Sequence, residues 1–460
     1  MWSKKSLEAA LHQQVPDLQF GKITIDSRNV NKSDIFIGIK GENFDGSNFA
    51  IDALAMGASI CITSFLPEKY SGDRIIVVED TYSDGLIKLA TYKRDNSDAT
   101  YIGVTGSIGK TTTKEMLKLV LSNSYASHGN LNNHYGLPLS LSNIDYSDFG
   151  IFELGMSAPG EISFLSKILR PDIAIITGIA PAHLEYFTSL DGIAAAKAEI
   201  IDGLSDSGVL VVNFDSPSLN VILKYSEEKN VVGYSYQGNA KAMVTLIESE
   251  VVESNGILFT NVSARYGSGP SDEINYTIRG IGKDLVENSL AILTTLIVAN
   301  LDLRNIEKLI DFETVNGRGK IHYIESCDVK LIDESYNSNP TSLSAALYRM
   351  NLYSQSTKYK RKVAILGDML ELGPNEVDLH CNVINDIKKY EIDSLILVGG
   401  RMRYLYEIVD KQFKVVHFNN STDIVTKIGE LIESGDLVMV KGSNGMKMSA
   451  ICSAIKNLLD

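Results

Sequence analysis

The amino-acid sequence predicts an α/β protein of three domains: a small N-terminal α/β domain, a central domain with a parallel β-sheet, and a C-terminal Rossmann-like domain. The first observation behind this prediction is length, because 460 residues at about 150 residues per domain suggest three domains. The second is the alternation of short apolar strands with helical stretches, which is typical of parallel sheets wrapped by helices.

Each segment of the chain contributes its own set of strands to this prediction. Residues 1–97 contain four strand-like runs and two helical stretches, and the runs are KITIDSR, DIFIGIK, ASICITS and RIIVVED. Residues 98–312 open with YIGVTG and continue through GIFELGM and PDIAIITGI. Residues 313–460 repeat the alternation through VKLIDESY, KVAILGD, DSLILVGG and DLVMVKGS. Ligands of such sheets bind at the carboxyl ends of the strands, so polar motifs there are the functional candidates.

Composition restricts the possible functions. The chain has 44% hydrophobic and 22% charged residues, which is typical of a globular protein, and its formal net charge of −14 argues against nucleic-acid binding. The four cysteines are far apart and form no C-x-x-C motif, so neither a zinc site nor a disulfide framework is indicated. We find no signal peptide and no apolar run of about 18 residues, and therefore expect a cytoplasmic protein without membrane insertion. A monomer is the working expectation.

A glycine-rich turn follows the strand YIGVT and precedes the helical stretch TTTKEMLKLVL. Its residues are Gly106, Ser107, Ile108, Gly109, Lys110, Thr111 and Thr112. In a phosphate-binding loop, backbone N–H groups hold nucleotide phosphates, the lysine reaches the terminal ones and the threonine hydroxyl holds Mg²⁺. Val104 replaces the glycine that usually lies five positions before Gly109, and a turn without function is the alternative. Strand, helix, lysine and threonine together favour nucleotide phosphates.

Two further candidates follow the next strands of the central segment. Glu153 ends the strand FGIFE, where a second carboxylate of a phosphate-loop enzyme normally faces magnesium. His183 lies in the loop after PDIAIITGI and is therefore expected at the same edge of the sheet. A solvated acid is the alternative for Glu153, and a packing or capping role is the alternative for His183.

Lys197 lies on the apolar face of a predicted helix. That face is formed by Ile193, Ala196, Ile200 and Leu204. An unpaired ammonium group there would be costly, so one interpretation is an ion pair with Glu199 or Glu153. The other is a lysine carbamylated by CO₂, which becomes an anion able to bind Mg²⁺ or to orient phosphate.

The start of the third segment carries three more candidates. Arg318, within Gly-Arg-Gly, lies at the predicted domain boundary, where its guanidinium reaches phosphates bound by the neighbouring domain or simply faces solvent. Asp333 ends an apolar strand and either accepts a hydrogen bond from a ribose hydroxyl or caps the next helix. Asn337 belongs to the polar turn that follows, in which a plain turn role is the alternative.

The sequence as a whole resembles the Mur ligase family. The resemblance covers nearly the entire chain and rests on motifs in a fixed order: DSR, KGENFDG, TGSIGKTTTKE, GNLNNHYGLPLSL, ELGMSAPGEI, AHLEYFTSLDGIAAAKAEI, GRG, DESYNSNP, LGDMLELG and VKGSNGMKMS. It implies an N-terminal domain that binds a UDP-sugar, a central P-loop ATPase domain and a C-terminal domain that admits an amine. The implied reaction is ATP-dependent amide-bond formation through an acyl phosphate, in peptidoglycan precursor synthesis.

The resemblance also implies roles for individual residues. The implied substrate-binding residues are Ser27, Arg28, Lys40, Asp45 and Asn337. The implied ATP-binding residues, beside Gly106 to Thr112, are Asn133 near the terminal phosphate, Asn288 near adenine, Arg318 and Asp333. The implied magnesium-binding residues are Thr111, Glu153, His183 and the carbamylated Lys197. Lys110, Lys197, His183 and Arg318 are the implied catalytic residues.

Within the family, the C-terminal motifs resemble those of members that join D-alanyl-D-alanine to UDP-N-acetylmuramoyl-tripeptide. The segment from Tyr336 to Pro340 differs from the pattern of members that add the third residue of the peptide, and folate-adding relatives lack these motifs. Departures from the usual pattern occur at Ser47, Gly178 and Asp284. A nucleotide-dependent switch is the rival functional class, and a degenerate binding module is a third. His380 is a speculative base for the amine, against a structural role at the surface.

Overall fold

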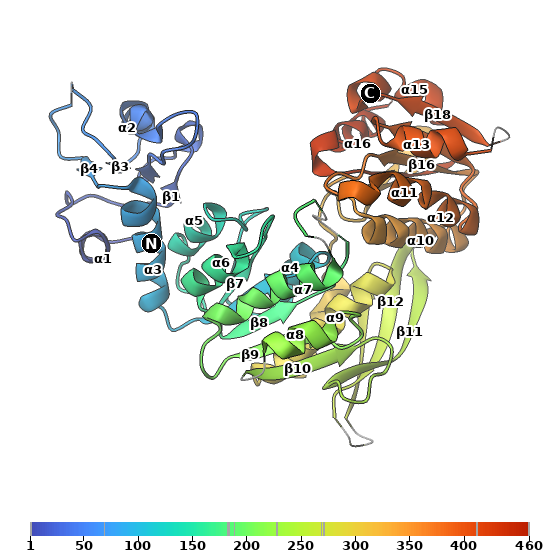
Figure 1. The fold of residues 1–460 in the computed structure, drawn as a ribbon, viewed down its shortest axis with the longest axis horizontal. Helices are drawn as coiled ribbons and strands as arrows, with labels where there is room; N and C mark the ends of the chain where they lie inside the picture. The colour runs from blue at the N-terminus through green and yellow to red at the C-terminus, as the bar shows by residue number, and fades with distance from the viewer. Residues whose placement is uncertain are drawn as a thin grey trace.

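The computed structural model describes residues 2–68, 70–181, 185–187, 189–226, 229–267, 269, 272–410 and 413–458. Its strands form three separate sheets of four, nine and six strands. The central domain lies between the N-terminal domain and the C-terminal domain (Figure 1). The predicted three-domain α/β class is confirmed, while the domain boundaries at residues 97 and 312 stay predictions.

The N-terminal domain has a parallel sheet in the order β1-β2-β3-β4. All four strands fall within the predicted runs. The elements are α1 (Lys4–Leu11), β1 (Ile23–Thr24), η1 (Ser27–Asn29), β2 (Ile35–Ile37), η2 (Gly46–Phe49), α2 (Ala50–Met56), β3 (Ile60–Thr63), β4 (Ile75–Val77), η3 (Thr81–Ile87) and α3 (Lys88–Asp95). Helix α1 begins after Ser3, whose hydroxyl accepts from the backbone N–H of Ser6 and so satisfies a free donor of the first turn.

The central domain contains a nine-stranded sheet in the order β13-β12-β11-β10-β9-β8-β5-β7-β6. Its strands are β5 (Thr100–Thr105), β6 (Ser124–Ala126), β7 (Phe149–Glu153), β8 (Ile173–Ile176), β9 (Val209–Asn213), β10 (Asn230–Ser235), β11 (Val244–Ser254), β12 (Ile257–Arg265) and β13 (Glu273–Arg279). Its helices are α4 (Lys110–Val120), α5 (Gly136–Ser142), α6 (Glu161–Leu169), α7 (Leu190–Ala198), η4 (Glu199–Gly203), α8 (Leu219–Tyr225), α9 (Lys283–Val298) and η5 (Leu303–Asp311).

The sheet is parallel from β6 to β11, as predicted, but β12 and β13 add to it in antiparallel fashion. The predicted alternation of strands and helices does not include these two antiparallel strands. Strands β11 and β12 are joined by Asn255 and Gly256, both with positive φ (52° and 77°). An Asn-Gly pair between alternating strands is a strong hairpin signal, because both residues tolerate the left-handed conformation of a tight turn.

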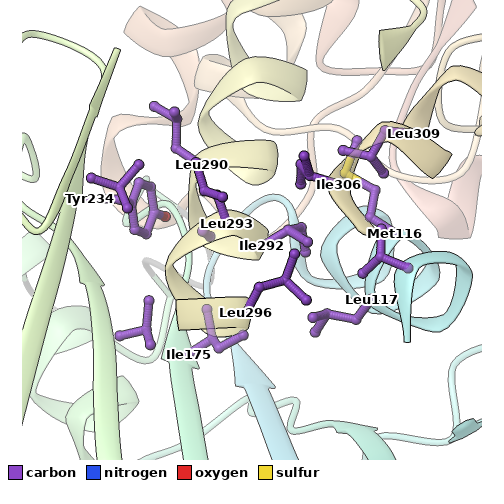
Figure 2. Close-up of a cluster of buried hydrophobic side chains, with 14 of the residues drawn as sticks. Met116, Leu117, Ile175, Tyr234, Leu290, Ile292, Leu293, Leu296, Ile306 and Leu309 are labelled. Carbon is purple, nitrogen blue, oxygen red and sulfur yellow. The ribbon is translucent and has the colours of Figure 1, made fainter. Parts of the chain in front are cut away.

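Helices cover both faces of the central sheet. Figure 2 shows one of the two cores, in which α4, α9 and η5 pack on β8 and β10. The labelled side chains of this core are Met116, Leu117, Ile175, Tyr234, Leu290, Ile292, Leu293, Leu296, Ile306 and Leu309. The opposite face packs against α5, α6 and α7. Burial on both faces explains why β5, β7 and β8 are continuously apolar.

The C-terminal domain has a sheet in the order β14-β15-β19-β16-β17-β18, in which only β14 is antiparallel among the described strands. Its strands are β14 (Lys320–Ile324), β15 (Val329–Glu334), β16 (Arg361–Gly367), β17 (Ser394–Val398), β18 (Lys414–Phe418) and β19 (Asp436–Lys441). Its helices are η6 (Glu325–Cys327), α10 (Pro340–Ser356), η7 (Gly373–Asn375), α11 (Glu376–Cys381), α12 (Val383–Lys389), α13 (Met402–Ile408), α14 (Ser421–Val425), α15 (Ile428–Leu431), η8 (Asn444–Met446) and α16 (Ser449–Lys456).

Hydrophobic cores on both faces of this third sheet agree with the predicted doubly wound topology. Asn339 caps α10 and Pro340 occupies its first turn, so the polar turn after β15 leads directly into a helix. Within the described part of the chain, every helix is too short or too polar to cross a lipid bilayer.

Candidate active site

A cavity of about 830 Å³ lies between the central and C-terminal domains. It forms where the carboxyl ends of four parallel strands, β5, β7, β15 and β19, approach one another. Ser107 and Glu153 line it from the central domain, and Glu334 and Lys441 line it from the C-terminal domain. Ligands of open α/β sheets bind at this end of the strands, so the cavity is the candidate active site.

The glycine-rich turn between β5 and α4 has the geometry of a phosphate-binding loop. Gly106 and Gly109 have φ angles of 150° and 85°. A Cβ atom at Gly106 would lie 1.9 Å from Oγ1 of Thr177, and one at Gly109 would lie 2.7 Å from Oδ1 of Asn288. Both positions therefore require glycine. The hydroxyl of Ser107 is buried without a hydrogen-bond partner among the described residues and lines the cavity, as expected for a group that binds a ligand.

Lys110 begins α4 and lines the cavity. Its ammonium group donates a 2.5 Å hydrogen bond to the carbonyl oxygen of Gly106. Burial lowers the pKa of Lys110 to about 8; the charge of Glu153 opposes this effect and that of Arg318 adds to it. An anionic ligand in the cavity would favour the protonated form.

Glu153, at the end of β7, is joined to the helix that follows the loop. Oγ1 of Thr111 donates a 3.2 Å hydrogen bond to Oε2 of Glu153. The ammonium group of Lys114 lies 3.3 Å from Oε1 of Glu153 and donates to the carbonyl oxygen of Ser127 at 2.7 Å. Lys114, which is fully buried, was missed by sequence reasoning. Its position four residues after Lys110, on the same helix face, is the signal that could have identified it.

Lys197 is buried on α7, as the apolar stripe predicts, and it lines the cavity. Its ammonium group makes no hydrogen bond or ion pair with any described residue. Neither expected carboxylate pairs with it, because Glu199 accepts from the backbone N–H of Gly160 at 2.8 Å and Glu153 pairs with Lys114. Burial and the nearby charge of Lys110 lower the pKa of Lys197 well below its usual value.

Two predicted ATP-binding residues, Asn133 and Asn288, line the central half of the cavity together with Ile108 and Thr112. Oδ1 of Asn133 accepts from the backbone N–H of Gly136 at 2.8 Å, so this side chain fixes the start of α5. Asn288, on α9, is largely buried, and its amide lies over Gly109 of the loop. The cavity thus brings together Glu153, Lys197, Asn133, Asn288 and most of the predicted loop residues. The exceptions are Gly106 and Thr111, which do not line it, and Thr111 touches the site through Glu153.

The C-terminal half of the cavity contains Arg318 and Asn337. The guanidinium of Arg318 stacks 4.1 Å above the ring of Tyr336, and no ion pair joins it to a carboxylate of the described residues. The carbonyl oxygen of Asn337 accepts from the ammonium group of Lys441 at 2.9 Å.

Asp333 is not brought into the cavity. Its Oδ1 accepts from the hydroxyl of Ser335 at 2.6 Å and from the thiol of Cys452 at 3.3 Å, on the other side of the sheet. It does not cap α10 either, because Asn339 does. Successive side chains of a strand point to opposite faces, so the next residue, Glu334, faces the cavity instead.

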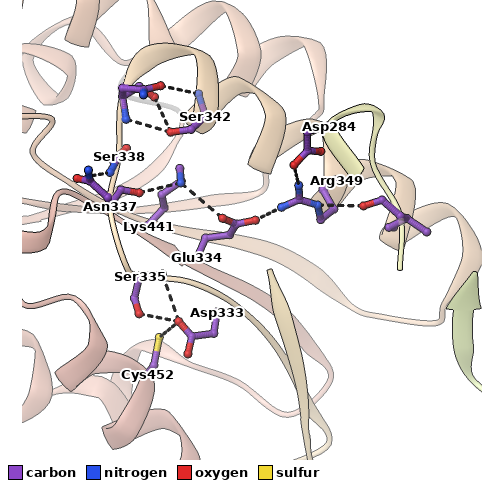
Figure 3. Close-up of polar contacts among 12 residues, drawn as sticks. Asp284, Asp333, Glu334, Ser335, Asn337, Ser338, Ser342, Arg349, Lys441 and Cys452 are labelled. Carbon is purple, nitrogen blue, oxygen red and sulfur yellow. Dashed lines mark hydrogen bonds and ion pairs between the residues drawn. The ribbon is translucent and has the colours of Figure 1, made fainter. Parts of the chain in front are cut away.

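A chain of alternating charges crosses the cavity from one domain to the other (Figure 3). The guanidinium of Arg349, on α10, contacts Oδ2 of Asp284 at 2.6 Å and also pairs with Glu334. The other oxygen of Glu334 lies 3.5 Å from the ammonium group of Lys441. Burial and the guanidinium groups of Arg349 and Arg318 lower the pKa of Lys441 to about 7, and the charge of Asp284 opposes this effect. Sequence reasoning missed Glu334, Arg349 and Lys441.

Comparison with known families identifies the chain. The family models for the Mur ligase catalytic domain, the middle domain and the glutamate ligase domain match residues 19–105, 104–296 and 317–444. The chain belongs to the Mur ligase family. Two curated relatives are UDP-N-acetylmuramoyl-tripeptide–D-alanyl-D-alanine ligases. That of Rickettsia prowazekii is 34% identical over 98% of this chain and 99% of its own, and that of Bacillus subtilis is 33% identical over 95% and 93%.

Solved structures agree with this family membership. The crystal structure of MurF from Acinetobacter baumannii matches this Mur ligase with a TM-score of 0.84 and 27% identity, over 99% of this chain and 98% of the other. MurF ligase from Thermotoga maritima in complex with ADP matches with a TM-score of 0.79 and 26% identity, over 96% and 99%. The three domains are therefore those of a Mur ligase.

Four predicted substrate-binding residues of this Mur ligase, all in the N-terminal domain, lie outside the cavity. In the N-terminal domain, the side chain of Arg28 is 86% exposed and pairs with Asp26. Asp45 accepts from the backbone N–H of Ser47 at 2.9 Å, and Lys40 bridges to Asp45 through the backbone. These residues and Ser27 do not line the cavity, so their substrate role stays a prediction. His183 falls outside the described residues.

The suggested role of His380 as a base is not supported. The side chain is fully buried, not at the surface, and it does not line the cavity. Its Nδ1 donates to the carbonyl oxygen of Glu376 at 2.6 Å, and its Nε2 accepts from the backbone N–H of Met369 at 3.0 Å. Burial lowers the pKa of His380, so it is a neutral structural residue.

The residues at the phosphate loop fit ATP and a divalent cation. The two glycines leave room for phosphates, and Ser107 and Lys110 offer donors to them. Among the described residues, no cluster of three or more His, Cys, Asp or Glu is arranged to hold a metal ion. Mg²⁺ in enzymes is usually held by one or two carboxylates together with substrate phosphates. Glu153 and Thr111 supply such a carboxylate and hydroxyl.

Proposed function

We propose that this Mur ligase uses ATP to join D-alanyl-D-alanine to UDP-N-acetylmuramoyl-tripeptide, a step of peptidoglycan precursor synthesis. The observation that carries the proposal is the cavity in which a phosphate loop with Lys110 and the buried Lys197 of the central domain face Arg318 of the C-terminal domain. Curated relatives with this activity match almost the full length of the chain, and a related ligase is known with ADP bound.

The first chemical step activates a carboxylate. A free carboxylate is a poor electrophile, so an oxygen of the terminal carboxylate of the tripeptide attacks the γ-phosphorus of ATP. The bond from that phosphorus to the β–γ bridging oxygen breaks, ADP leaves, and an acyl phosphate forms. Lys110 and Arg318 offset the charge that develops on the transferred group.

The second step forms the amide. The neutral amine of D-alanyl-D-alanine attacks the carbonyl carbon of the acyl phosphate, and the tetrahedral intermediate collapses with release of inorganic phosphate and a proton. No side-chain nucleophile is required, so the task of the protein is positioning and charge stabilisation. An active site shared between two domains suits this task, because relative domain movement admits the substrates and then encloses them.

A magnesium ion held by Thr111, Glu153 and, on the family resemblance, His183 would offset the charge of the ATP phosphates. Lys197, buried without a partner among the described residues and with a lowered pKa, is suited to carbamylation. Its neutral amine attacks CO₂, a proton leaves, and a carbamate anion replaces an unpaired ammonium group. That anion would lie on the cavity wall near Lys110, where it orients the metal or the phosphate.

We assign the UDP-sugar end of the substrate to the N-terminal surface of Ser27, Arg28, Lys40 and Asp45, and the incoming amine to the C-terminal side near Asn337. The predicted cytoplasmic location and monomeric state are part of the proposal. UDP-linked precursors and ATP meet in the cytoplasm, and one chain contains all three domains.

The test is phosphate release from ATP and Mg²⁺ with the two acceptor substrates supplied separately and together, with the product followed by mass. Release of phosphate together with the amide product, only when both acceptors are present, is the expected result. Equal release without the acceptors would contradict the proposal and favour an ATP-driven switch. Lys110→Met, with the phosphate loop otherwise intact, serves as the inactive control.

A further inference from the structure

Arg349 lies at the centre of the charge chain and contacts both domains. Arg349 contacts the central domain through Asp284 and through the carbonyl oxygen of Ile281, to which its Nε donates at 3.1 Å. It contacts the C-terminal domain, to which it belongs, through Glu334. The planar guanidinium uses a different N–H group for each partner, a geometry that a lysine could not reproduce.

Two glycines make room for this arginine. A Cβ atom at Gly282, before α9, would lie 3.2 Å from Nε of Arg349, and one at Gly319 would lie 3.1 Å from its Nη1. Both glycines have positive φ angles, 127° and 93°. A glycine from each domain thus leaves room for the guanidinium, Gly282 before α9 of the central domain and Gly319 before β14 of the C-terminal domain.

Two neighbours of Arg349, Asp284 and Gly319, lie close in the chain to residues that line the cavity. Asp284 lies in the first turn of α9, and Asn288 one turn later lies over Gly109. Gly319 directly follows Arg318 in the chain. Arg349 therefore lies close to one cavity-lining residue of each domain, Asn288 in the central domain and Arg318 in the C-terminal domain.

The charges of the chain balance. Asp284 and Glu334 offset Arg349 and Lys441, so the chain forms without a bound anion. Lys110, Lys197 and Arg318 have no carboxylate bonded to them in the described part of the cavity. The positive charge available to phosphates thus comes mainly from Lys110 and Arg318, while Arg349 and Lys441 are already paired.

We infer that Arg349 is a positioning residue for the ligase reaction: its pairs with Asp284 and Glu334 hold the C-terminal domain against α9 so that Arg318 faces the phosphate loop. This inference rests on the proposed function. Arg349→Met leaves Asp284 without its partner and Glu334 with Lys441 alone, so the ionic link between the two domains is lost and their separation is favoured. Nucleotide binding to the central domain should be little affected, whereas transfer of the phosphoryl group needs both domains.

The experiment compares Arg349→Met, Asp284→Asn and the double variant in the full-length enzyme. The control is Arg361→Met, because Arg361 forms a largely buried ion pair with Asp436 at 2.7 Å inside the C-terminal domain, away from the cavity. We expect Arg349→Met to lower kcat at least tenfold, with the Kd for ADP within twofold of the original. We expect Arg361→Met to keep kcat within twofold. The double variant should lose no more than the worse single variant, since both changes break one contact.

Small-angle scattering of the ligand-free enzyme keeps this inference separate from the proposed function. We expect Arg349→Met to have a larger radius of gyration than both the original chain and Arg361→Met. The inference is overturned if that radius is unchanged, if kcat stays within twofold, or if the losses of the two single variants multiply. An original chain that forms no amide would refute the proposed function, and the scattering comparison would still decide whether Arg349 sets the domain arrangement.

Discussion

Oγ1 of Thr111 donates a 3.2 Å hydrogen bond to Oε2 of Glu153 and so joins the helix after the phosphate loop to the end of the neighbouring strand. The second oxygen of the carboxylate faces the ammonium group of Lys114 at 3.3 Å. The carboxylate is therefore oriented before a ligand binds. Such preorganisation matters in phosphoryl transfer, because catalysis there depends mostly on positioning and electrostatic stabilisation.

Glu153→Gln should abolish most of the activity. The substitution removes the charge that would face the metal ion, so we expect kcat to fall about 100-fold or more and the magnesium concentration for half-maximal rate to rise. Glu115→Gln is the matched control, because Oε1 of Glu115 also pairs with Lys114, at 3.0 Å, but does not line the cavity. Similar losses in both variants would mean that pairing with Lys114, rather than metal binding, explains the effect.

Binding of ADP should take up protons at a pH near or above 8. Burial lowers the pKa of Lys110 to about 8, and phosphates nearby favour its protonated form. Calorimetric titration at about pH 8.5 in two buffers of different ionisation enthalpy measures this uptake. We expect a larger uptake for the original chain than for Lys110→Met. Equal uptake in both would show that Lys110 does not change its protonation on binding.

The lowered pKa of Lys110 should make the free energy of unfolding rise with pH. The pKa of Lys110 falls from 10.5 in the unfolded chain to about 8 in the folded one, so between these values the unfolded state binds more protons. The free energy of unfolding rises with pH wherever that is the case. A change from about pH 8 to about pH 10 should therefore stabilise the original chain more than it stabilises Lys110→Met. Thermal unfolding of both proteins at the two pH values measures this difference.

Lys197→Ala should be inactive and should recover partly when a small carboxylic acid is added. The truncated side chain leaves space on the cavity wall, and an added carboxylate can supply the anionic group that the carbamate would provide. The measurement is phosphate release with increasing acetate, with Lys110→Met as the control that acetate does not restore. Lack of rescue, combined with full activity of the original chain in CO₂-free buffer, would falsify the carbamate proposal.

His380→Ala should lower stability without changing the pH dependence of the reaction. The substitution removes a buried ring and leaves the N–H of Met369 and the carbonyl of Glu376 without their partner, which costs about 2–4 kcal/mol. The pH profile of kcat, taken at a temperature at which the variant is folded, should keep its shape. Loss of one limb of that profile would restore His380 as a candidate base.

Sequence periodicity predicted the parallel sheets well, because strands buried on both faces are continuous apolar runs between helices. It failed at β11 to β13, where one-sided burial gives a weaker alternating pattern and the Asn255-Gly256 turn was the informative signal. Asp333 is the acid that the sequence offered at the end of β15, whereas Glu334 is the one that lines the cavity. Two adjacent acids at a strand end point to opposite faces, and the sequence alone does not say which face carries the cavity.

The sequence by itself determined the fold class, the phosphate loop and the inward position of Lys197, because each depends on residues close together in the chain. Only the tertiary structure decided the partners of the buried charges. Lys114 with Glu153, and Arg349 with Asp284 and Glu334, join residues from different elements. Such pairs depend on how helices and domains pack, and local sequence patterns do not specify that packing.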